Sequence, residues 1–334
     1  MIDLPNADPR GSEAKAPSDT PPVAFGPVPS RRLGRSLGIN NIPPKTCSYS
    51  CTYCQLGRTT RMVSERAEFH APKEILRGVR KRVREAEQAG ESIDYLTFVA
   101  DGEPTLDVRL GEAIDLLRSL GWPIAVISNA SLLWRADVRD DLAGADWVSL
   151  KVDAADETTW RTLNRPHRSL RFGRIQDGLL EFAEGFGGRL VSETMLVGGV
   201  NDDERHVDGI AALVGRLKPA VAYVAAPTRP PAEPWVDLPR MDAIVGAHQS
   251  FGERVKRVEL LIGYEGNEFT SSGGLEETLL GTTAVHPMRE EAVDELLMRT
   301  GGNRSVVRRL VQEGRLVRLD HGGHTFYVRG LPGR

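Results

Sequence analysis

Residues 45–55 read KTCSYSCTYCQ and hold all three cysteines of the 334-residue chain, Cys47, Cys51 and Cys54. The C-x3-C-x2-C spacing puts three thiols within eight positions, which is too crowded for a network of structural disulfides. Thiolates bind zinc, copper(I) or iron–sulfur clusters. A closed zinc site needs a fourth protein ligand, and the next histidine, His70, lies sixteen residues beyond Cys54. Three thiolates instead suit a [4Fe–4S] cluster with one open iron, and a zinc knuckle or three free buried thiols is the alternative.

The composition favours a globular protein with a sizeable core. A chain of 334 residues is long enough for one barrel-sized domain and a small module. The formal net charge of −3 argues against a protein that coats nucleic acid along its whole length. No stretch approaches the ~18 apolar residues of a membrane span, and the N-terminus has no apolar signal segment. We therefore expect a cytoplasmic protein that does not contact membranes.

Strands and helices alternate from the cysteine stretch onward. The β-rich runs that we predict as strands are 39–43, 93–100, 124–127, 147–152, 190–197 and 221–225. Helical patterns follow them, and this order predicts an α/β protein with a parallel sheet. The proline-rich residues 226–240 are predicted to form a loop across the mouth of the sheet. In parallel barrels the reacting groups lie where the strands end, and polar motifs follow these predicted strands.

Two of these motifs follow the second and third predicted strands. Asp101-Gly102-Glu103-Pro104 ends the second, where Gly102 permits close approach of a ligand to the backbone and Glu103 either orders the turn or accepts hydrogen bonds. Ser128 and Asn129 end the third. We expect both motifs to face the cofactor site.

The fourth and fifth predicted strands carry polar groups inside apolar runs. Ser149, Lys151 and Asp153 share one face of the fourth strand, which predicts a wet cavity; a buried Lys151–Asp153 ion pair is the alternative. Lys151 is also a candidate nucleophile toward a substrate carbonyl. Glu193 is costly to bury unpaired, so it is expected to bind a protein arginine or a cationic substrate.

Basic residues cluster after the fourth strand and near the C-terminus. The first group either attracts an anionic substrate or forms an ordinary surface run, and consists of Arg161, Arg165, His167, Arg168, Arg171 and Arg174. Residues 283–334 carry nine arginines against six acidic residues. Two predicted helices and a hairpin in this segment resemble a winged-helix module, whose Arg304, Arg308 and Arg309 either meet phosphates or lie on a solvated face that binds a partner. We predict a disordered leader over 1–24, a barrel over 25–270 and this module over 283–334.

Taken together, these motifs resemble the radical S-adenosylmethionine (radical SAM) superfamily, in the branch related to wyosine-forming tRNA-modifying enzymes. The matching segments are Ser30 to Gly34, Lys45 to Cys47, Tyr53 to Thr59, Asp101 to Leu106 and Leu163 to Pro166. The resemblance implies a partial (β/α)6 barrel with a [4Fe–4S] cluster on Cys47, Cys51 and Cys54. In that family S-adenosylmethionine chelates the open iron and is cleaved reductively to a 5′-deoxyadenosyl radical, and the resemblance implies an electron donor such as flavodoxin or ferredoxin.

The resemblance also implies roles for residues around the cofactor. Tyr53 is the aromatic residue before the last cysteine, and Gly102 and Glu103 belong to the turn that receives the amino group of S-adenosylmethionine. Ser128, Asn129, Lys151 and Asp153 correspond to groups that contact its ribose and carboxylate.

The chain departs from the family pattern in two respects. Asp101 replaces the first glycine of a Gly-Gly-Glu signature, and the chain has no cysteines for the second cluster of the wyosine-forming enzymes. The substrate of the wyosine-forming enzymes therefore cannot be assigned to this chain. We expect RNA or a protein, recognised through the C-terminal module. The competing hypothesis is a metal-binding regulator of nucleic acid with a catalytically inert barrel.

Overall fold

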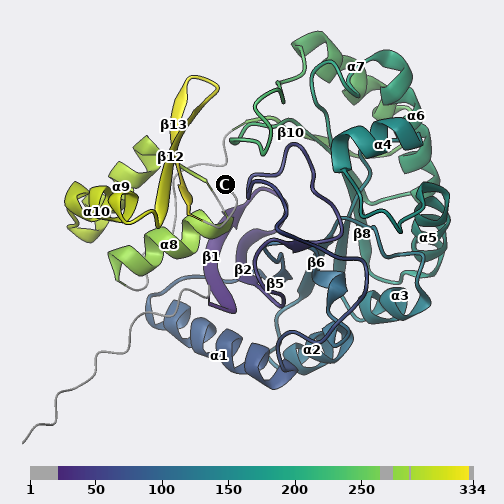
Figure 1. Ribbon diagram of the computed structural model, residues 1–334. Helices are drawn as coiled ribbons and strands as arrows, with labels where there is room; N and C mark the ends of the chain where they lie inside the picture. The colour runs from purple at the N-terminus through teal and green to yellow at the C-terminus, as the bar shows by residue number, and fades with distance from the viewer. Residues whose placement is uncertain (1–21, 264–273, 286, 331–334) are drawn as a thin grey trace, which may run out of the picture.

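The computed structural model describes residues 22–263, 274–285 and 287–330. Its main feature is a strongly curved sheet with helices on the outside, and a smaller C-terminal unit lies beside it (Figure 1). The disordered leader predicted over 1–24 falls almost wholly outside the described residues. The predicted partial barrel is confirmed.

The sheet has eight strands in the order β1-β2-β5-β6-β7-β8-β9-β10. All neighbouring pairs are parallel except β1 and β2. The bounds of the strands are β1 Ala24–Ser30, β2 Gly34–Ile39, β5 Tyr95–Phe98, β6 Ile124–Ser128, β7 Trp147–Lys151, β8 Arg189–Met195, β9 Val221–Ala225 and β10 Val258–Leu261. Because the strand order follows the chain, the carboxyl ends of successive parallel strands lie side by side.

The described residues of the barrel form seven α-helices, of which α4 and α5 both lie between β7 and β8. Their bounds are α1 Pro72–Gln88, α2 Leu110–Arg118, α3 Ala136–Ala143, α4 Glu157–Asn164, α5 Phe172–Gly185, α6 Glu204–Leu217 and α7 Met241–Gly252. Apolar faces at helical spacing explain their packing; in α1, for example, Ile75, Val79 and Val83 are buried against the sheet. Strands such as β9 are buried at every position, as expected for a parallel sheet covered by helices.

The hairpin of β1 and β2 differs from the sequence prediction, which placed only a short strand at 39–43. Pro27 and Pro29 lie inside β1, and the pairing shifts register between Phe25 and Val28. Proline is tolerated on an edge strand because its missing N–H is not needed by a neighbour. Because of these two prolines, the sequence pattern did not predict β1, the first strand of the sheet.

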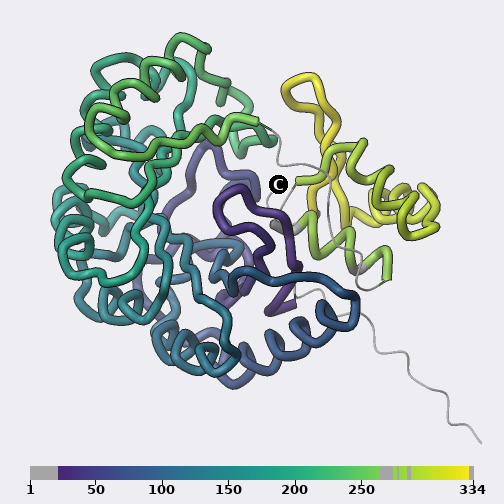
Figure 2. Tube along the Cα trace, turned by 180° about the vertical axis from the view of Figure 1, so that it is seen from behind, coloured from purple at the N-terminus to yellow at the C-terminus, as the bar shows by residue number. Residues whose placement is uncertain are grey.

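The C-terminal unit runs helix, strand, helix, helix, strand, strand. Its elements are α8 Leu275–Val285, β11 Met288–Arg289, α9 Glu290–Thr300, α10 Arg304–Gln312, β12 Leu316–His321 and β13 His324–Arg329. It has its own core, which includes Leu279 and Leu280 and so begins before the boundary expected at 283. The unit lies next to β1 at the open side of the half-barrel, as both views show (Figures 1 and 2).

Contacts with both β1 and the proline-rich loop join this unit to the barrel. α8 contacts β1, and Nε2 of His321 at the tip of the β12–β13 hairpin lies 2.9 Å from the carbonyl oxygen of Pro227. Among the described residues, no helix is long and apolar enough to cross a membrane.

Candidate active site

The cysteine stretch forms a loop at the carboxyl edge of the sheet, between the short strands β3 Thr46–Cys47 and β4 Arg61–Met62. We call residues 45–60 the cluster loop. On one side, the N–H of Glu103 donates to the carbonyl of Thr46 (3.2 Å). On the other, the N–H groups of Thr52 and Ser50 donate to the carbonyls of Leu163 (2.8 Å) and Asn164 (3.0 Å). The loop is therefore held by backbone bonds from two different βα units.

The three cysteines are free thiols and are partly exposed at this edge. Burial raises the pKa of Cys47 well above its usual range, and the charges of Cys51 and Cys54 raise it further. Burial, followed by the charge of Cys54, raises the pKa of Cys51 to about 12. Three ionised sulfurs this close together need added positive charge, which iron supplies. The donor set thus fits an iron–sulfur cluster.

No group of three His, Cys, Asp or Glu side chains lies close enough to bind a single metal ion in the part of the chain that the structure describes. A [4Fe–4S] cluster does not require such convergence, because each thiolate binds a different iron.

Gly102 and Glu103 shape the turn on which the cluster loop rests. A Cβ atom on Gly102 would lie 1.9 Å from the carbonyl oxygen of Thr46, so the missing side chain lets the cluster loop approach this turn. The contact of Gly102 with the cofactor stays a prediction. Glu103 is 1% exposed and accepts bonds from the side chains of Thr105 (2.6 Å) and Ser128 (2.8 Å) and from the N–H of Asn129 (2.7 Å). Burial raises the pKa of Glu103, and these donors lower it. Its role in this structure is to order the turn.

Asn129 reaches a cluster-loop cysteine, whereas Ser128 does not. The side-chain amide of Asn129 donates to the hydroxyl of Ser48 (3.0 Å) and lies 3.5 Å from the sulfur of Cys47. Ser128 is buried, and it donates to Glu103 and accepts from the N–H of Ala130. Ser128 therefore stabilises the turn of Glu103 and does not contact the cysteines.

Asp153 and Tyr53 meet at the end of β7, together with a residue that was not predicted. The hydroxyl of Tyr53 donates to Asp153. The amide of Asn164, at the end of α4, donates to Asp153 (2.9 Å) and lies 3.5 Å from the sulfur of Cys51. Asn164 belongs to the Leu163-Asn164-Arg165-Pro166 motif, which is the only sequence signal that could have identified it. Amides thus contact two of the three cysteine sulfurs.

Lys151 pairs with Glu193, not with Asp153. The two residues are register partners on β7 and β8, and Nζ of Lys151 lies 3.0 Å from Oε1 of Glu193. Arg32 forms a second ion pair with Glu193, so the carboxylate binds protein cations, one of the two predicted options. Lys151 also lies 4.9 Å from the centre of the Tyr53 ring. The side chain is therefore fixed between the cluster loop and the concave face of the sheet.

A cavity of about 330 Å³ lies within the curve of the sheet, bounded by the β1–β2 turn, the cluster loop and the proline-rich loop. This volume is in the range of small-molecule sites. Tyr53 and Cys54 line it, and its charged lining residues are Arg31, Arg32, Lys151, Arg229 and Glu193. Four cations against one carboxylate make the cavity electropositive.

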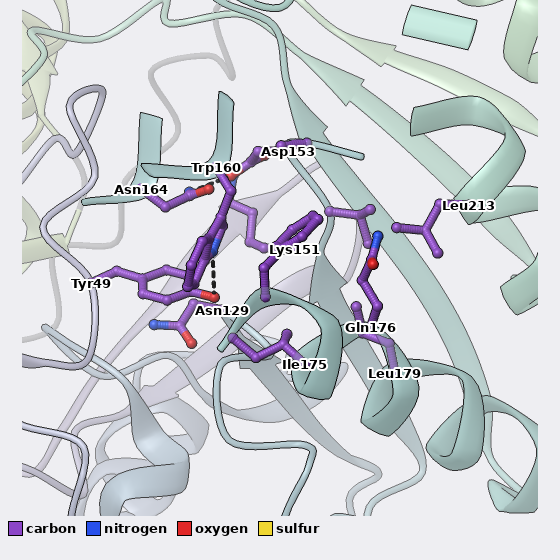
Figure 3. Close-up of a pocket in the computed structure, with 13 residues that line it drawn as sticks. Tyr49, Asn129, Lys151, Asp153, Trp160, Asn164, Ile175, Gln176, Leu179 and Leu213 are labelled. Atoms are coloured by element: carbon purple, nitrogen blue, oxygen red, sulfur yellow. Dashed lines mark hydrogen bonds between the residues drawn. The ribbon is translucent and has the colours of Figure 1, made fainter. Parts of the chain in front are cut away.

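A second, much smaller hollow lies behind the cluster loop, under Tyr49, Asn129, Asp153 and Asn164 (Figure 3). Its volume is about 20 Å³, enough for one water molecule. The indole N–H of Trp160 donates to the hydroxyl of Tyr49 (3.0 Å), as Figure 3 shows. This hollow is too small for a substrate.

The proline-rich residues 226–240 form a loop, as predicted, and Glu233 fastens this loop to the cluster loop. This side chain is 5% exposed and forms ion pairs with Arg58 (2.7 Å) and Arg165. Hydrogen bonds from Arg58 and then Arg165 lower the pKa of Glu233. Its N–H also donates to the carbonyl of Thr52 (3.0 Å). Glu233 was not predicted, since no local pattern distinguishes it from other loop acids.

Asp101 is buried, and neither carboxylate oxygen has a hydrogen-bond partner among the described residues. Burial raises its pKa to about 7, although the charge of Arg329 in β13 opposes this. The charge of Arg329 in the C-terminal unit therefore acts on Asp101, in the turn that carries Gly102.

A half-barrel with three free thiols at its carboxyl edge, one of which lines an electropositive cavity, is the arrangement of an α/β protein that binds a cofactor. The family model of the radical SAM superfamily matches residues 41–208, and the chain belongs to that superfamily. Membership implies a [4Fe–4S] cluster and S-adenosylmethionine as cofactors, and a reductant to supply electrons.

The chain is also similar to the following proteins. A UPF0026 protein of Methanocaldococcus jannaschii is 44% identical over 314 residues, which cover 93% of this chain and 97% of that protein. A radical SAM methyltransferase from Sphaerobacter thermophilus has a similar fold, with a TM-score of 0.52 and 19% identity over 68% of this chain and 66% of that one. TYW1 with a lysine–pyruvate adduct bound has a TM-score of 0.51 and 18% identity over 66% of this chain and 74% of that one. These two structures show the fold.

Proposed function

We propose that the protein cleaves S-adenosylmethionine reductively at the cluster loop and starts radical chemistry on an anionic substrate in the 330 Å³ cavity. The observation that carries the proposal is the position of Cys54, which belongs to the three-cysteine set and also lines the cavity. A reduced [4Fe–4S] cluster supplies the electron that breaks the carbon–sulfur bond of S-adenosylmethionine.

We assign the cluster to Cys47, Cys51 and Cys54. Asn129 and Asn164 lie near two of these sulfurs and orient the loop that carries them. Tyr53, Lys151 and Asp153 are the assigned contacts of S-adenosylmethionine, supported by their position between the cluster loop and the strand ends. Gly102, Glu103 and Ser128 hold the turn beneath.

The charge of the cavity supports an anionic substrate. Arg31, Arg32, Lys151 and Arg229 line it, and Glu193 is the acid that balances part of this charge. A concave site of one charge sign concentrates ligands of the opposite sign. RNA is one such substrate, and the C-terminal unit, proposed as a winged-helix-like module, is the candidate for recognising it or a protein partner.

The helix α10 contributes less to RNA binding than its sequence indicates. Arg304 pairs with Asp294 and Glu290, and Arg309 pairs with Glu276 and Glu313. Only Arg308, of the three arginines on this helix, lacks an acidic partner among the described residues. A nucleic-acid regulator with an inert barrel, the competing hypothesis, is therefore not favoured.

Anaerobic reconstitution with iron and sulfide, followed by reduction with dithionite, tests the proposal. We expect the protein to release 5′-deoxyadenosine and methionine from S-adenosylmethionine, and Cys47→Ala to abolish the release. No cleavage by a protein that carries its cluster would refute the proposed function. We propose a cytoplasmic location and an electron donor such as flavodoxin or ferredoxin.

A further inference from the structure

The predicted basic run after β7 does not line the cavity. Its members Arg168, Arg171 and Arg174 are absent from the cavity wall, whose basic residues are Arg31, Arg32, Lys151 and Arg229. The run needs another explanation, and its position next to the cluster loop provides one.

The segment that carries this run lies directly against the cluster loop. The N–H of His167 donates to the carbonyl of Ser48 (2.8 Å), and Tyr49 forms an antiparallel bridge with Pro166. The hydroxyls of Ser64 and Ser169 lie 2.7 Å apart, so the chain leaving β4 also meets this segment. Residues 166–169 are thus one backbone bond away from the peptide next to Cys47.

Four exposed arginines lie in or beside these segments: Arg61 in β4, Arg168 and Arg171 before α5, and Arg174 in the first turn of α5. We call them the basic face. None of them has an acidic partner among the described residues. Arg61 lies over Phe69 and Arg174 over Trp134, while Arg171 donates to backbone carbonyls. Two exposed acids adjoin this face: Glu65, which follows Ser64 in the chain, and Asp177, one turn after Arg174 on α5. The face therefore has a net positive charge.

We propose that the basic face is the docking surface for an acidic one-electron carrier protein that reduces the cluster. The inference rests on the proposed function. One electron leaves the carrier for each S-adenosylmethionine cleaved, and the sulfonium is reduced as its carbon–sulfur bond breaks to give methionine and a 5′-deoxyadenosyl radical.

Two features favour a carrier protein over an RNA substrate at this face. A carrier has to come close to the cluster without entering the cavity, and the face adjoins the peptide next to Cys47 but is not part of the cavity wall. A substrate has to enter the cavity, which the cluster loop borders at Tyr53, Cys54 and Gln55. Complementary charge accelerates such short-lived encounters without a large interface.

Charge reversal with a choice of reductant tests the proposal. The double variant Arg168→Glu/Arg171→Glu is compared with Arg77→Glu/Arg80→Glu, which makes the same charge change on exposed residues of α1, separated from α5 by α2 and α3 around the barrel (Figure 1). Release of 5′-deoxyadenosine is measured with dithionite, and separately with flavodoxin, its reductase and NADPH. We expect the first variant to keep its dithionite-driven rate and to lose about tenfold or more of its flavodoxin-driven rate at low salt. The α1 variant should keep both rates.

The outcomes distinguish a failure of the docking surface from a failure of the proposed function. Equal flavodoxin-driven rates in the two variants would overturn the docking surface, as would loss of RNA binding with unchanged flavodoxin-driven cleavage. No cleavage by the wild type with dithionite would overturn the proposed function itself. If the first variant does not retain its cluster, the wild type still decides the question: its flavodoxin-driven rate, and not its dithionite-driven rate, should fall steeply as salt is raised. A salt-independent flavodoxin rate would contradict the docking surface.

Discussion

Gly102 has no room for a side chain, because a Cβ atom there would lie 1.9 Å from the carbonyl oxygen of Thr46. Glu103 next to it is occupied by donors from three residues. At the scale of single residues, these two groups fix the path of the cluster loop. Asp101, in contrast, is buried without a hydrogen-bond partner among the described residues. In this turn, Gly102 and Glu103 stabilise the structure, whereas the burial of the Asp101 carboxylate is not offset by hydrogen bonds.

Gly102→Ala should displace the cluster loop. Its methyl group would collide with backbone, and overpacking of this kind costs about 1–3 kcal/mol of unfolding free energy. We expect a lower midpoint of urea denaturation and less iron per chain after reconstitution. The matched control is Gly173→Ala on α5, where a Cβ meets nothing within 4 Å. Equal iron content and stability in both variants would show that the loop does not depend on Gly102.

Asp101 should make stability depend on pH. Its pKa is raised by burial from an ordinary value of 3.8 to about 7, so the folded protein keeps a proton that the unfolded chain releases. The free energy of unfolding should fall as pH rises through this window and level off above it. Relative to the wild type, Asp101→Asn should gain about 2–3 kcal/mol between pH 5 and pH 8 in urea denaturation. A constant difference between the two proteins across this range would contradict the assigned burial.

At the scale of elements, the site depends on contacts between segments that lie far apart in the chain. The proline-rich loop was predicted from its composition, but the ion pairs of Glu233 with Arg58 and Arg165 were not. Lys151 meets Glu193 because β7 and β8 pair in the register that places them opposite each other. Local periodicity predicts a strand, whereas register is a property of two strands together.

Glu233→Gln should loosen the proline-rich loop over the cluster loop. The substitution removes the charge that Arg58 and Arg165 share and leaves the backbone bond to Thr52 intact. We expect the reconstituted protein to lose iron to a chelator several-fold faster than the wild type. Glu157→Gln on α4 is the control, since its exposed pair with Arg161 should contribute little. Matching rates of iron loss would mean that Glu233 does not secure the loop.

At the scale of the whole molecule, the parallel strands follow one another in sequence order, so each βα unit adds its motif to one edge. This is why the cysteine stretch, Gly102, Asn129 and Lys151 could be assigned to a common site before the structure was known. The β1 strand was missed because prolines mask it. The approach of Arg329 to Asp101 was missed because it joins two units that no local pattern relates.

The central claim is that Cys47, Cys51 and Cys54 hold an iron–sulfur cluster with one iron open to S-adenosylmethionine. The most direct test is electron paramagnetic resonance of the anaerobically reconstituted and reduced protein, with and without S-adenosylmethionine, together with metal analysis. The account predicts iron and sulfide in the ratio of a [4Fe–4S] cluster and a signal that changes when S-adenosylmethionine is added. Zinc in place of iron, or a cluster signal unchanged by S-adenosylmethionine, would contradict it.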